Sequence, residues 1–186
     1  MIKTLLFVAT LFVSISVMSQ SLKSSAQSHE GFNVSFGVSS NTTLPTPLSP
    51  ISQRTMVGVA KLNYTLGLPF PGKLGLSASF DLTDSKINST KSLTIKKPSE
   101  VTIEPVFLAI DKAIVYGKLG LYYSRYDTPT SSVSKTGDAY GIGYKNYLLD
   151  QNFIQLELTQ RTTERNSLGT NKFKQNVGSV SIGYTF

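Results

Sequence analysis

The chain has no cysteine and one histidine, and its 11 acidic residues are outnumbered by 18 basic ones. Without cysteine it forms no disulfide framework, no thiolate metal site and no lipid-anchored cysteine. The histidine, His29, lies in a serine-rich segment, where we expect a solvated side chain. The net charge of +7 favours acidic partners, but the basic residues are too interleaved with Asp and Glu to indicate nucleic acid.

Recognisable catalytic and cofactor motifs are missing as well. The sequence has no Gly-rich phosphate loop and no metal-ligand cluster, so we expect no cofactor and no metal. A histidine-serine hydrolase needs its histidine held near a hydroxyl and an acid, and the position of His29 does not suit that role. A carboxylate site built from Glu157 or Glu104 with Asp81 is the alternative, but ion pairing explains these residues more simply. The sequence therefore indicates a protein that is not an enzyme.

Long apolar runs are scarce. Lys3 precedes a short apolar segment, Leu5 to Val13, and small residues follow at the spacing for cleavage after Ser19, with Ala26 as an alternative position. About 15 apolar-leaning residues are few for a helix that must cross roughly 30 Å, so residues 1–19 indicate a cleaved secretory signal rather than an anchor. No later window approaches 18 apolar residues, and we expect no transmembrane helix.

What the chain has in abundance is strict alternation of apolar and small or polar residues. Leu76, Ala78 and Phe80 alternate with Ser77 and Ser79, the pattern of a strand with two different faces. The same pattern predicts eight strands, at about 31–39, 54–66, 73–82, 99–110, 115–126, 140–145, 154–161 and 174–186. Proline cannot donate a ladder hydrogen bond, so we expect a bulge or a register disturbance at Pro105 in the fourth strand.

The connections between these strands alternate in length. The long ones, at about 40–53, 83–98, 127–137 and 165–173, are rich in Ser, Thr, Asn, Pro and Lys, and the short ones are 67–72, 111–114 and 147–151. In an up-and-down barrel, odd and even connections lie at opposite ends. The sequence therefore predicts an all-β fold, an eight-stranded antiparallel transmembrane barrel over residues 31–186, with a β-sandwich as the alternative.

The last strand carries the most specific feature of the chain. Val180, Ile182, Tyr184 and Phe186 are apolar at every second position up to the carboxyl terminus. This ending resembles the insertion signature of Gram-negative outer-membrane barrels, and Tyr116 to Leu121 is similar to a strand common in them. The chain resembles the small eight-stranded family that includes the OmpA transmembrane domain, OmpX and opacity-type proteins. The resemblance implies an outer-membrane location with both termini periplasmic, contact with outer-membrane lipid and lipopolysaccharide, and assembly by periplasmic chaperones and the barrel-assembly machinery.

Aromatic residues gather near both ends of the predicted strands, as in the interfacial belts of membrane barrels. Towards the short connections these are Tyr64, Phe107, Tyr144, Phe153, Tyr184 and Phe186. Towards the long connections they are Phe80, Tyr123, Tyr126, Tyr140 and Phe173.

Charged residues share the inward face of the predicted strands. They are Lys61, Lys73, Asp81, Glu104, Lys118, Lys145, Glu157 and Arg161. Charges enclosed in a narrow lumen need partners, so we predict an ion-pair network in which Glu104 and Glu157 bind Lys or Arg from neighbouring strands. A narrow porin-like channel for ions or small solutes is the alternative use of the same charges.

Residues 20–30 are expected to form a periplasmic segment before the barrel. Basic residues cluster in the long connections, where outward placement would let them meet lipopolysaccharide phosphates or a host or surface polymer. They are Lys86, Lys91, Lys96, Lys97, Arg165, Lys172 and Lys174. The sequence thus predicts surface-exposed loops with a structural, adhesive or surface-interaction role.

Overall fold

The computed structural model describes residues 30–44, 52–68, 72–87, 93–110, 112–127, 129, 131–148, 151–163 and 174–186. Within these ranges every regular element is a strand, and no helix has the length and hydropathy needed to cross a bilayer. The strands are β1 (Gly31–Thr43), β2 (Gln53–Gly67), β3 (Lys73–Asp81), β4 (Ser85–Ile87), β5 (Leu93–Ile110), β6 (Ala113–Asp127), β7 (Ser132–Tyr147), β8 (Asn152–Thr163) and β9 (Lys174–Thr185).

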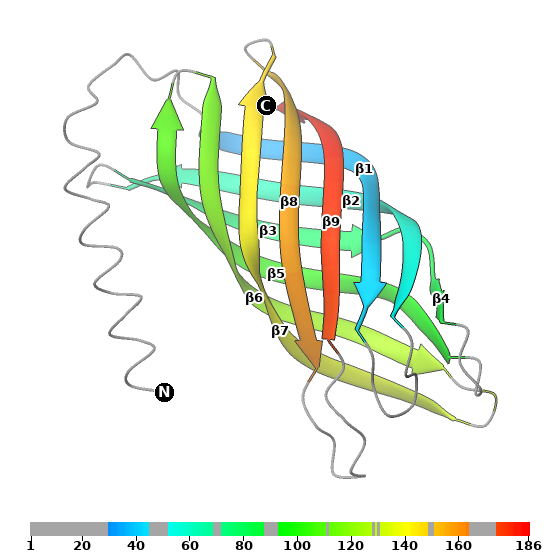
Figure 1. Cartoon of the computed structure of the whole chain (residues 1–186). Coiled ribbons are helices and arrows are strands. Elements are labelled where there is room, and N and C mark those ends of the chain that lie inside the picture. Colours follow the sequence, from blue (N-terminus) through cyan, green and yellow to red (C-terminus); the bar gives the residue numbers. More distant parts are fainter. Residues whose placement is uncertain are drawn as a thin grey trace, which may run out of the picture.

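Eight of these strands close into an antiparallel barrel (Figure 1). Each pairs with its neighbour in the chain, and the first strand, β1, pairs with the last, β9, from Asn33 opposite Thr185 to Thr43 opposite Gln175. The short β4 pairs with β5 beyond the ring, while β3 pairs directly with β5. Closure leaves the ring without a free edge, as a sheet surrounded by lipid requires. The predicted fold class is confirmed.

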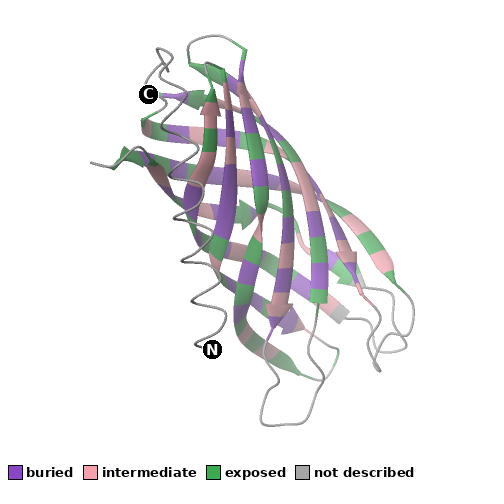
Figure 2. Cartoon of the chain, turned by 60° about the vertical axis from the view of Figure 1, so that its left-hand side comes forward, coloured by how far each residue is buried: buried purple, intermediate pink, exposed green. Residues whose placement is uncertain are grey.

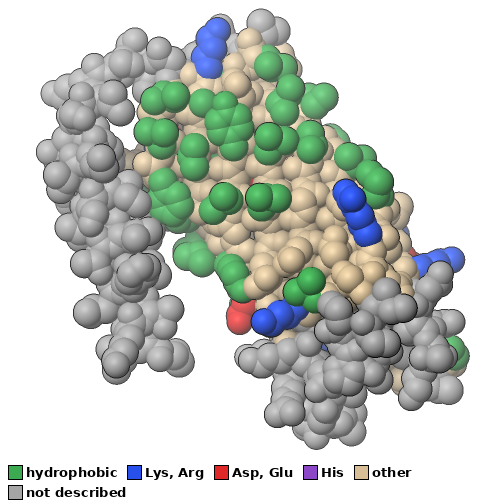
Figure 3. All heavy atoms as spheres, in the orientation of Figure 1, with side chains coloured by type: hydrophobic (Ala, Val, Ile, Leu, Met, Phe, Trp, Pro, Cys, Tyr) green, Lys and Arg blue, Asp and Glu red, His purple; other side chains and the backbone are tan. Residues whose placement is uncertain are grey.

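Burial alternates along each strand (Figure 2). On β1, for example, Asn33, Ser35 and Ser39 are buried, whereas Phe36 is 61% exposed and Val38 is 53% exposed. The buried face is polar and the exposed face is apolar, and the apolar side chains gather on the outer wall (Figure 3). This polarity is the inverse of that of a water-soluble sandwich, whose apolar side chains face inward.

The connections at the two ends differ in length, with one exception. We call the end with connections 68–72, 111–112 and 148–151 the turn end, and the opposite end the loop end (Figure 1). Three of the four expected long connections are present, as 44–52, 82–92 (which includes β4) and 164–173. The prediction of a third long connection, at 127–137, is wrong. There β6 and β7 form a hairpin that pairs as far as Asp127 opposite Ser132, because backbone pairing continues where the apolar alternation stops.

The ladder between β5 and β6 is irregular at two points. One register shift lies between Val106 and Leu108, directly after Pro105, so the disturbance expected at this proline is present. The second shift, between Lys96 and Ser99, was not expected from the sequence. It contains Lys97 with a positive φ of 29° and the buried Pro98. Asp84 braces this bulge, since its carboxylate accepts hydrogen bonds from the Lys96 ammonium at 2.8 Å and the Lys97 amide at 3.1 Å.

Two members of the expected aromatic belts face inward instead. Phe153 is 1% exposed and Tyr126 is 7% exposed, so both fill the barrel rather than its outer wall. Each has the strand parity of inward polar residues, Phe153 with Gln155 and Tyr126 with Ser124. Parity, and not distance from the strand end, decides the direction of a side chain.

Some expectations fall outside the described residues. They are the signal at 1–19, the segment 20–29 with His29, and the side chains of Lys91, Arg165, Lys172 and Phe173.

Candidate functional site

Seven charged side chains form one continuous row of ion pairs inside the barrel. The order is Glu104, Lys61, Glu157, Lys118, Glu100, Arg161 and Asp81, so acid and base alternate along it. The nitrogen–oxygen distances are 2.5 Å for Lys61 to both Glu104 and Glu157, 3.1 Å for Lys118 to Glu157 and 3.3 Å for Lys118 to Glu100. The Nε of Arg161 donates to Glu100, and its two terminal nitrogens donate to the two oxygens of Asp81, each at 3.1 Å.

This row of ion pairs crosses the lumen. Lys61 on β2 joins Glu104 on β5 to Glu157 on β8, and Arg161 on β8 joins Glu100 on β5 to Asp81 on β3. The expectation that Glu104 and Glu157 take basic partners holds, but both bind lysines of non-adjacent strands. In a narrow barrel, long side chains meet near the axis more easily than along the wall.

Neutral groups satisfy the remaining acceptors of the network. Glu104 accepts hydrogen bonds from Asn63 at 2.9 Å and Ser77 at 2.7 Å. Glu157 accepts one from the Tyr116 hydroxyl at 2.7 Å, and Asp81 accepts one from Asn41 at 2.9 Å. Buried ion pairs offset their desolvation cost only when such additional bonds complete them, and the carboxylates of this network have these bonds.

An aromatic plug, which consists of Ile114, Tyr116, Tyr147 and Phe153, fills the lumen at the turn end. Two glycines make room for it, because a Cβ on Gly143 would overlap the ring of Tyr116 and one on Gly183 would overlap the ring of Phe153.

Lys145 lies against this plug. Its ammonium lies 4.4 Å from the Phe153 ring centre, a cation–π contact. With Lys145, the buried set holds four cations and four carboxylates and is neutral in sum.

The loop end of the lumen is also filled. Ile95, Val57 and Tyr122 are 1%, 3% and 1% exposed, and the Tyr122 ring lies 5.2 Å from the Arg161 guanidinium. The small strand β4 lies over β2 here, since the Thr55 hydroxyl donates to Ser85 at 3.1 Å. From plug to β4, the interior is therefore packed with side chains.

The set of buried charged residues differs from the set expected in the lumen by one exception and one omission. Seven of the eight expected residues are buried, with exposures of 2% to 7%, and the exception is Lys73, which is half-buried at the start of β3 on the turn end. The omission is Glu100, which joins Lys118 to Arg161. Its parity equals that of Thr102 and Glu104, so the alternation already contained the signal.

The carboxy-terminal residues lie on the outer wall. Val180, Ile182, Tyr184 and Phe186 are 37% to 71% exposed. The Phe186 amide donates to the Phe32 carbonyl at 2.8 Å, and the two phenyl rings lie 6.1 Å apart. The terminus thus clasps β1 across the closing seam.

The expected basic residues of the loop end are exposed wherever the structure describes their side chains. Lys86 lies on β4, Lys96 and Lys97 on β5, and Lys174 at the start of β9. Lys96 pairs with Asp84, and this contact raises the pKa of Lys96 and lowers the pKa of Asp84. Arg125 on β6 pairs with Asp127 at 3.0 Å. Basic groups thus outnumber acidic ones on this rim.

The carboxylates of the alternative site are held in ion pairs. In the part of the chain that the structure describes, no group of three His, Cys, Asp or Glu residues is placed to hold a metal ion. Glu104, Glu157 and Asp81, the alternative carboxylate site, are each bound by a cation.

No protein-family model matches the sequence, and its comparison with curated proteins gives no match. Several solved structures match the fold. The attachment invasion locus protein Ail of Yersinia pestis, in complex with the heparin analogue sucrose octasulfate, is 21% identical with a TM-score of 0.57, over 84% of this chain and 99% of Ail. OprG of Pseudomonas aeruginosa is 17% identical with a TM-score of 0.54, over 87% and 99%. Neisserial surface protein A is 9% identical with a TM-score of 0.57, over 84% and 97%.

Identities this low show a common fold. The matches extend over nearly the whole length of each of these proteins, so the likeness covers the complete barrel. The resemblance stated from the strand pattern and the last residues is confirmed at this level. This chain has the fold of the small eight-stranded outer-membrane β-barrels.

Proposed function

We propose that this protein is an integral barrel of a bacterial outer membrane that is not an enzyme and does not conduct, and that its loop end faces outward and binds acidic polymers. The observation that carries the proposal is the inverted polarity, with exposed apolar residues such as Leu158 and Ile182 outside and paired charges inside. An apolar outer wall is stable only in lipid. Both termini then lie on the periplasmic side, with Phe186 accessible to the assembly machinery.

The packed lumen argues against the narrow channel. An ion moving along the axis would have to pass the Arg161 pairs, the two lysine bridges and the aromatic plug. Breaking one buried ion pair costs about 3–5 kcal/mol when the partner charge stays behind. A conducting path would therefore require a different packing of the interior.

The basic rim supports a role in binding polyanions. Lys86 and Lys97 are exposed, on β4 and on the bulge that Asp84 braces, so both present their charge from ordered backbone. Sulfate and phosphate groups are the natural partners of such point charges. Ail, which has the same fold, was crystallised with a sulfated heparin analogue. Lipopolysaccharide and host polysaccharides carry the same chemistry.

Binding of sucrose octasulfate to the refolded barrel in zwitterionic detergent tests this role. The Lys86→Gln/Lys97→Gln double variant should bind about 2- to 30-fold more weakly, if each exposed contact contributes about 0.2–1 kcal/mol. The matched control, Lys112→Gln, removes a charge from the turn end and should bind like the unaltered protein. The rim would be excluded as the binding surface if all three proteins had equal affinity, or if the affinity did not change with ionic strength.

A further inference from the structure

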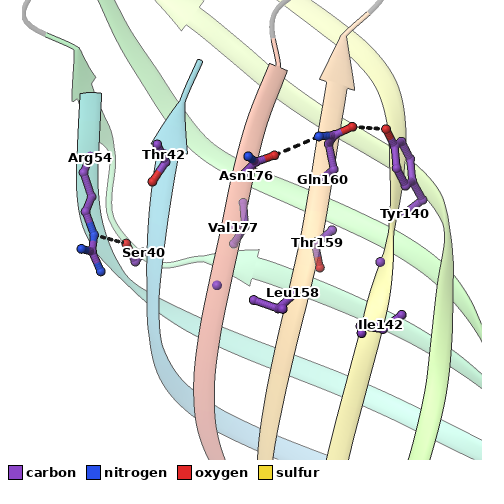
Figure 4. A pocket seen from close by; sticks show the side chains of 12 residues that line it. Ser40, Thr42, Arg54, Tyr140, Ile142, Leu158, Thr159, Gln160, Asn176 and Val177 are labelled. Atoms are coloured by element: carbon purple, nitrogen blue, oxygen red, sulfur yellow. Dashed lines mark hydrogen bonds between the residues drawn. The ribbon is translucent and has the colours of Figure 1, made fainter. Parts of the chain in front are cut away.

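A row of five polar side chains crosses the outer wall on the loop-end side of the apolar surface (Figure 4). Strand pairing places Tyr140 opposite Gln160, Gln160 opposite Asn176, Asn176 opposite Thr42, and Thr42 opposite Arg54. The Gln160 amide donates to Asn176 at 2.9 Å, and the Tyr140 hydroxyl donates to Gln160. Five strands about 4.8 Å apart make this polar row roughly 19 Å wide.

The wall is hollowed next to the polar row. The next paired positions towards the turn end are Ile142, Leu158, Gly178 and Ser40, and a groove of about 560 Å³ lies over them. Gly178 is its floor, because a Cβ added there would have one neighbour within 4 Å, Leu158 Cδ2 at 3.6 Å.

A second groove extends the hollow further. It measures about 400 Å³, has almost entirely apolar walls, and shares Ile142, Leu158 and Gly178 with the first. It continues towards the turn end over Tyr144, Leu156 and Val180. The two grooves together form one hollow on the outer wall, which we call the channel; it is separate from the lumen. Its end at the polar row is polar, and its end towards the turn end is apolar.

Arg54 supplies the charge at the polar head of the channel. Its side chain is exposed, and its Nε donates to the Ser40 hydroxyl at 2.5 Å, which holds the guanidinium beside Ser40 at the β2 end of the polar row (Figure 4). Ser40 uses one of the five guanidinium donors, and among the described residues no carboxylate lies within ion-pair distance of Arg54. The other donors suit the oxygens of a phosphate, which a guanidinium binds with two parallel hydrogen bonds.

We propose that this channel binds one molecule of lipopolysaccharide. A phosphate of its lipid A lies on Arg54, sugar hydroxyls lie along the polar row, and one acyl chain lies in the apolar groove. A row of amide and hydroxyl groups on four strands, with the Arg54 guanidinium on the fifth, matches a phosphorylated disaccharide, whereas a glycerophospholipid head would cover only part of it. The inference rests on the proposed function in one respect: the loop end must face the outer leaflet, where lipopolysaccharide resides.

Native mass spectrometry of the refolded chain in detergent, titrated with deep-rough lipopolysaccharide, tests the site. We expect one tightly bound molecule per barrel, and about tenfold weaker binding for both Arg54→Gln and Gly178→Leu. A Cβ at Gly178 would contact the Leu158 side chain at an ordinary van der Waals distance of 3.6 Å and no backbone atom within 4 Å, so we expect this variant to fold, which heat-dependent gel migration verifies. Two matched controls, Lys112→Gln and Ala78→Leu, make the same kinds of change outside the channel and away from the basic rim, and both should bind like the unaltered protein.

Four results would overturn the proposal. They are unchanged binding by both channel variants, equal binding of dephosphorylated lipopolysaccharide, equally tight binding of phosphatidylglycerol, and a barrel dimer that Gly178→Leu abolishes. Binding in detergent does not depend on which end of the barrel faces outward. Orientation is tested separately by surface labelling of a cysteine introduced at Lys86 in cells, so a wrong orientation and an absent site are distinguishable.

Discussion

Arg161 is the most constrained residue of the lumen. It binds Glu100 and both oxygens of Asp81, and all three side chains are almost completely buried. Its removal would leave Asp81 without a cation and Glu100 with Lys118 as its remaining basic partner. The loss of these pairs should destabilise the barrel more than the loss of the side chain itself, because an unpaired buried charge retains its desolvation cost.

We predict that Arg161→Ala lowers the free energy of unfolding by about 3–5 kcal/mol, measured by urea titration of the barrel in lipid vesicles. Adding Asp81→Asn and Glu100→Gln to the same chain should restore most of the loss, since the two carboxylates that Arg161 bound are then replaced by neutral amides. Arg161→Lys keeps the charge but loses the bidentate contact with Asp81. Its free energy of unfolding should therefore lie between those of Arg161→Ala and the unaltered protein. A loss below about 1 kcal/mol for Arg161→Ala would mean that the Arg161 pairs contribute little.

Single strands show how far alternation reaches as a predictor. On β8, Ile154, Leu156 and Leu158 face outward and Gln155, Glu157 and Thr159 face inward, as the sequence predicts. The prediction that Phe153 lies in an outer belt is wrong. Phe153 is near a strand end, but its parity is that of the inward residues. The hairpin at 127–137 was missed for a different reason. At the tip of this hairpin both faces of β7 are exposed or partly exposed, so no apolar period marks its strands.

Pairings within the lumen depend on information that alternation does not contain. Lys61 meets Glu157 because eight strands have a particular register and stagger around the barrel. Alternation gives the face of each side chain but not its height along the axis. The sequence therefore predicts which residues share the lumen, while the partner of each charge follows from the closed structure.

At the level of one strand, the cost of a charge should depend on depth. Leu156 is the middle of the three outward apolar residues of β8, and Asn152 begins the same strand at the turn end. We predict that Leu156→Arg lowers the free energy of unfolding in vesicles by about 2–4 kcal/mol and Asn152→Arg by about 0–1 kcal/mol. Equal costs at the two positions would argue that lipid does not surround this strand.

For the whole molecule, closure of the lumen decides between a surface protein and a pore. The neutral set of four cations and four carboxylates, the plug at Tyr116 and Phe153, and the side chains beneath β4 fill the barrel along its axis. The fold itself does not decide the matter, because small barrels of one architecture serve different functions. The contents of the lumen and the surface of the loop end distinguish this chain.

Single-channel recording of the refolded barrel in a planar bilayer tests the central claim most directly. The closed lumen predicts silence at salt concentrations and voltages where the barrel remains folded, with insertion verified by protease protection of the same preparation. The Arg161→Ala variant is the companion measurement, because it removes the link between Glu100 and Asp81. Stable, ion-dependent steps from the unaltered protein would contradict the account and make the lumen a gated channel.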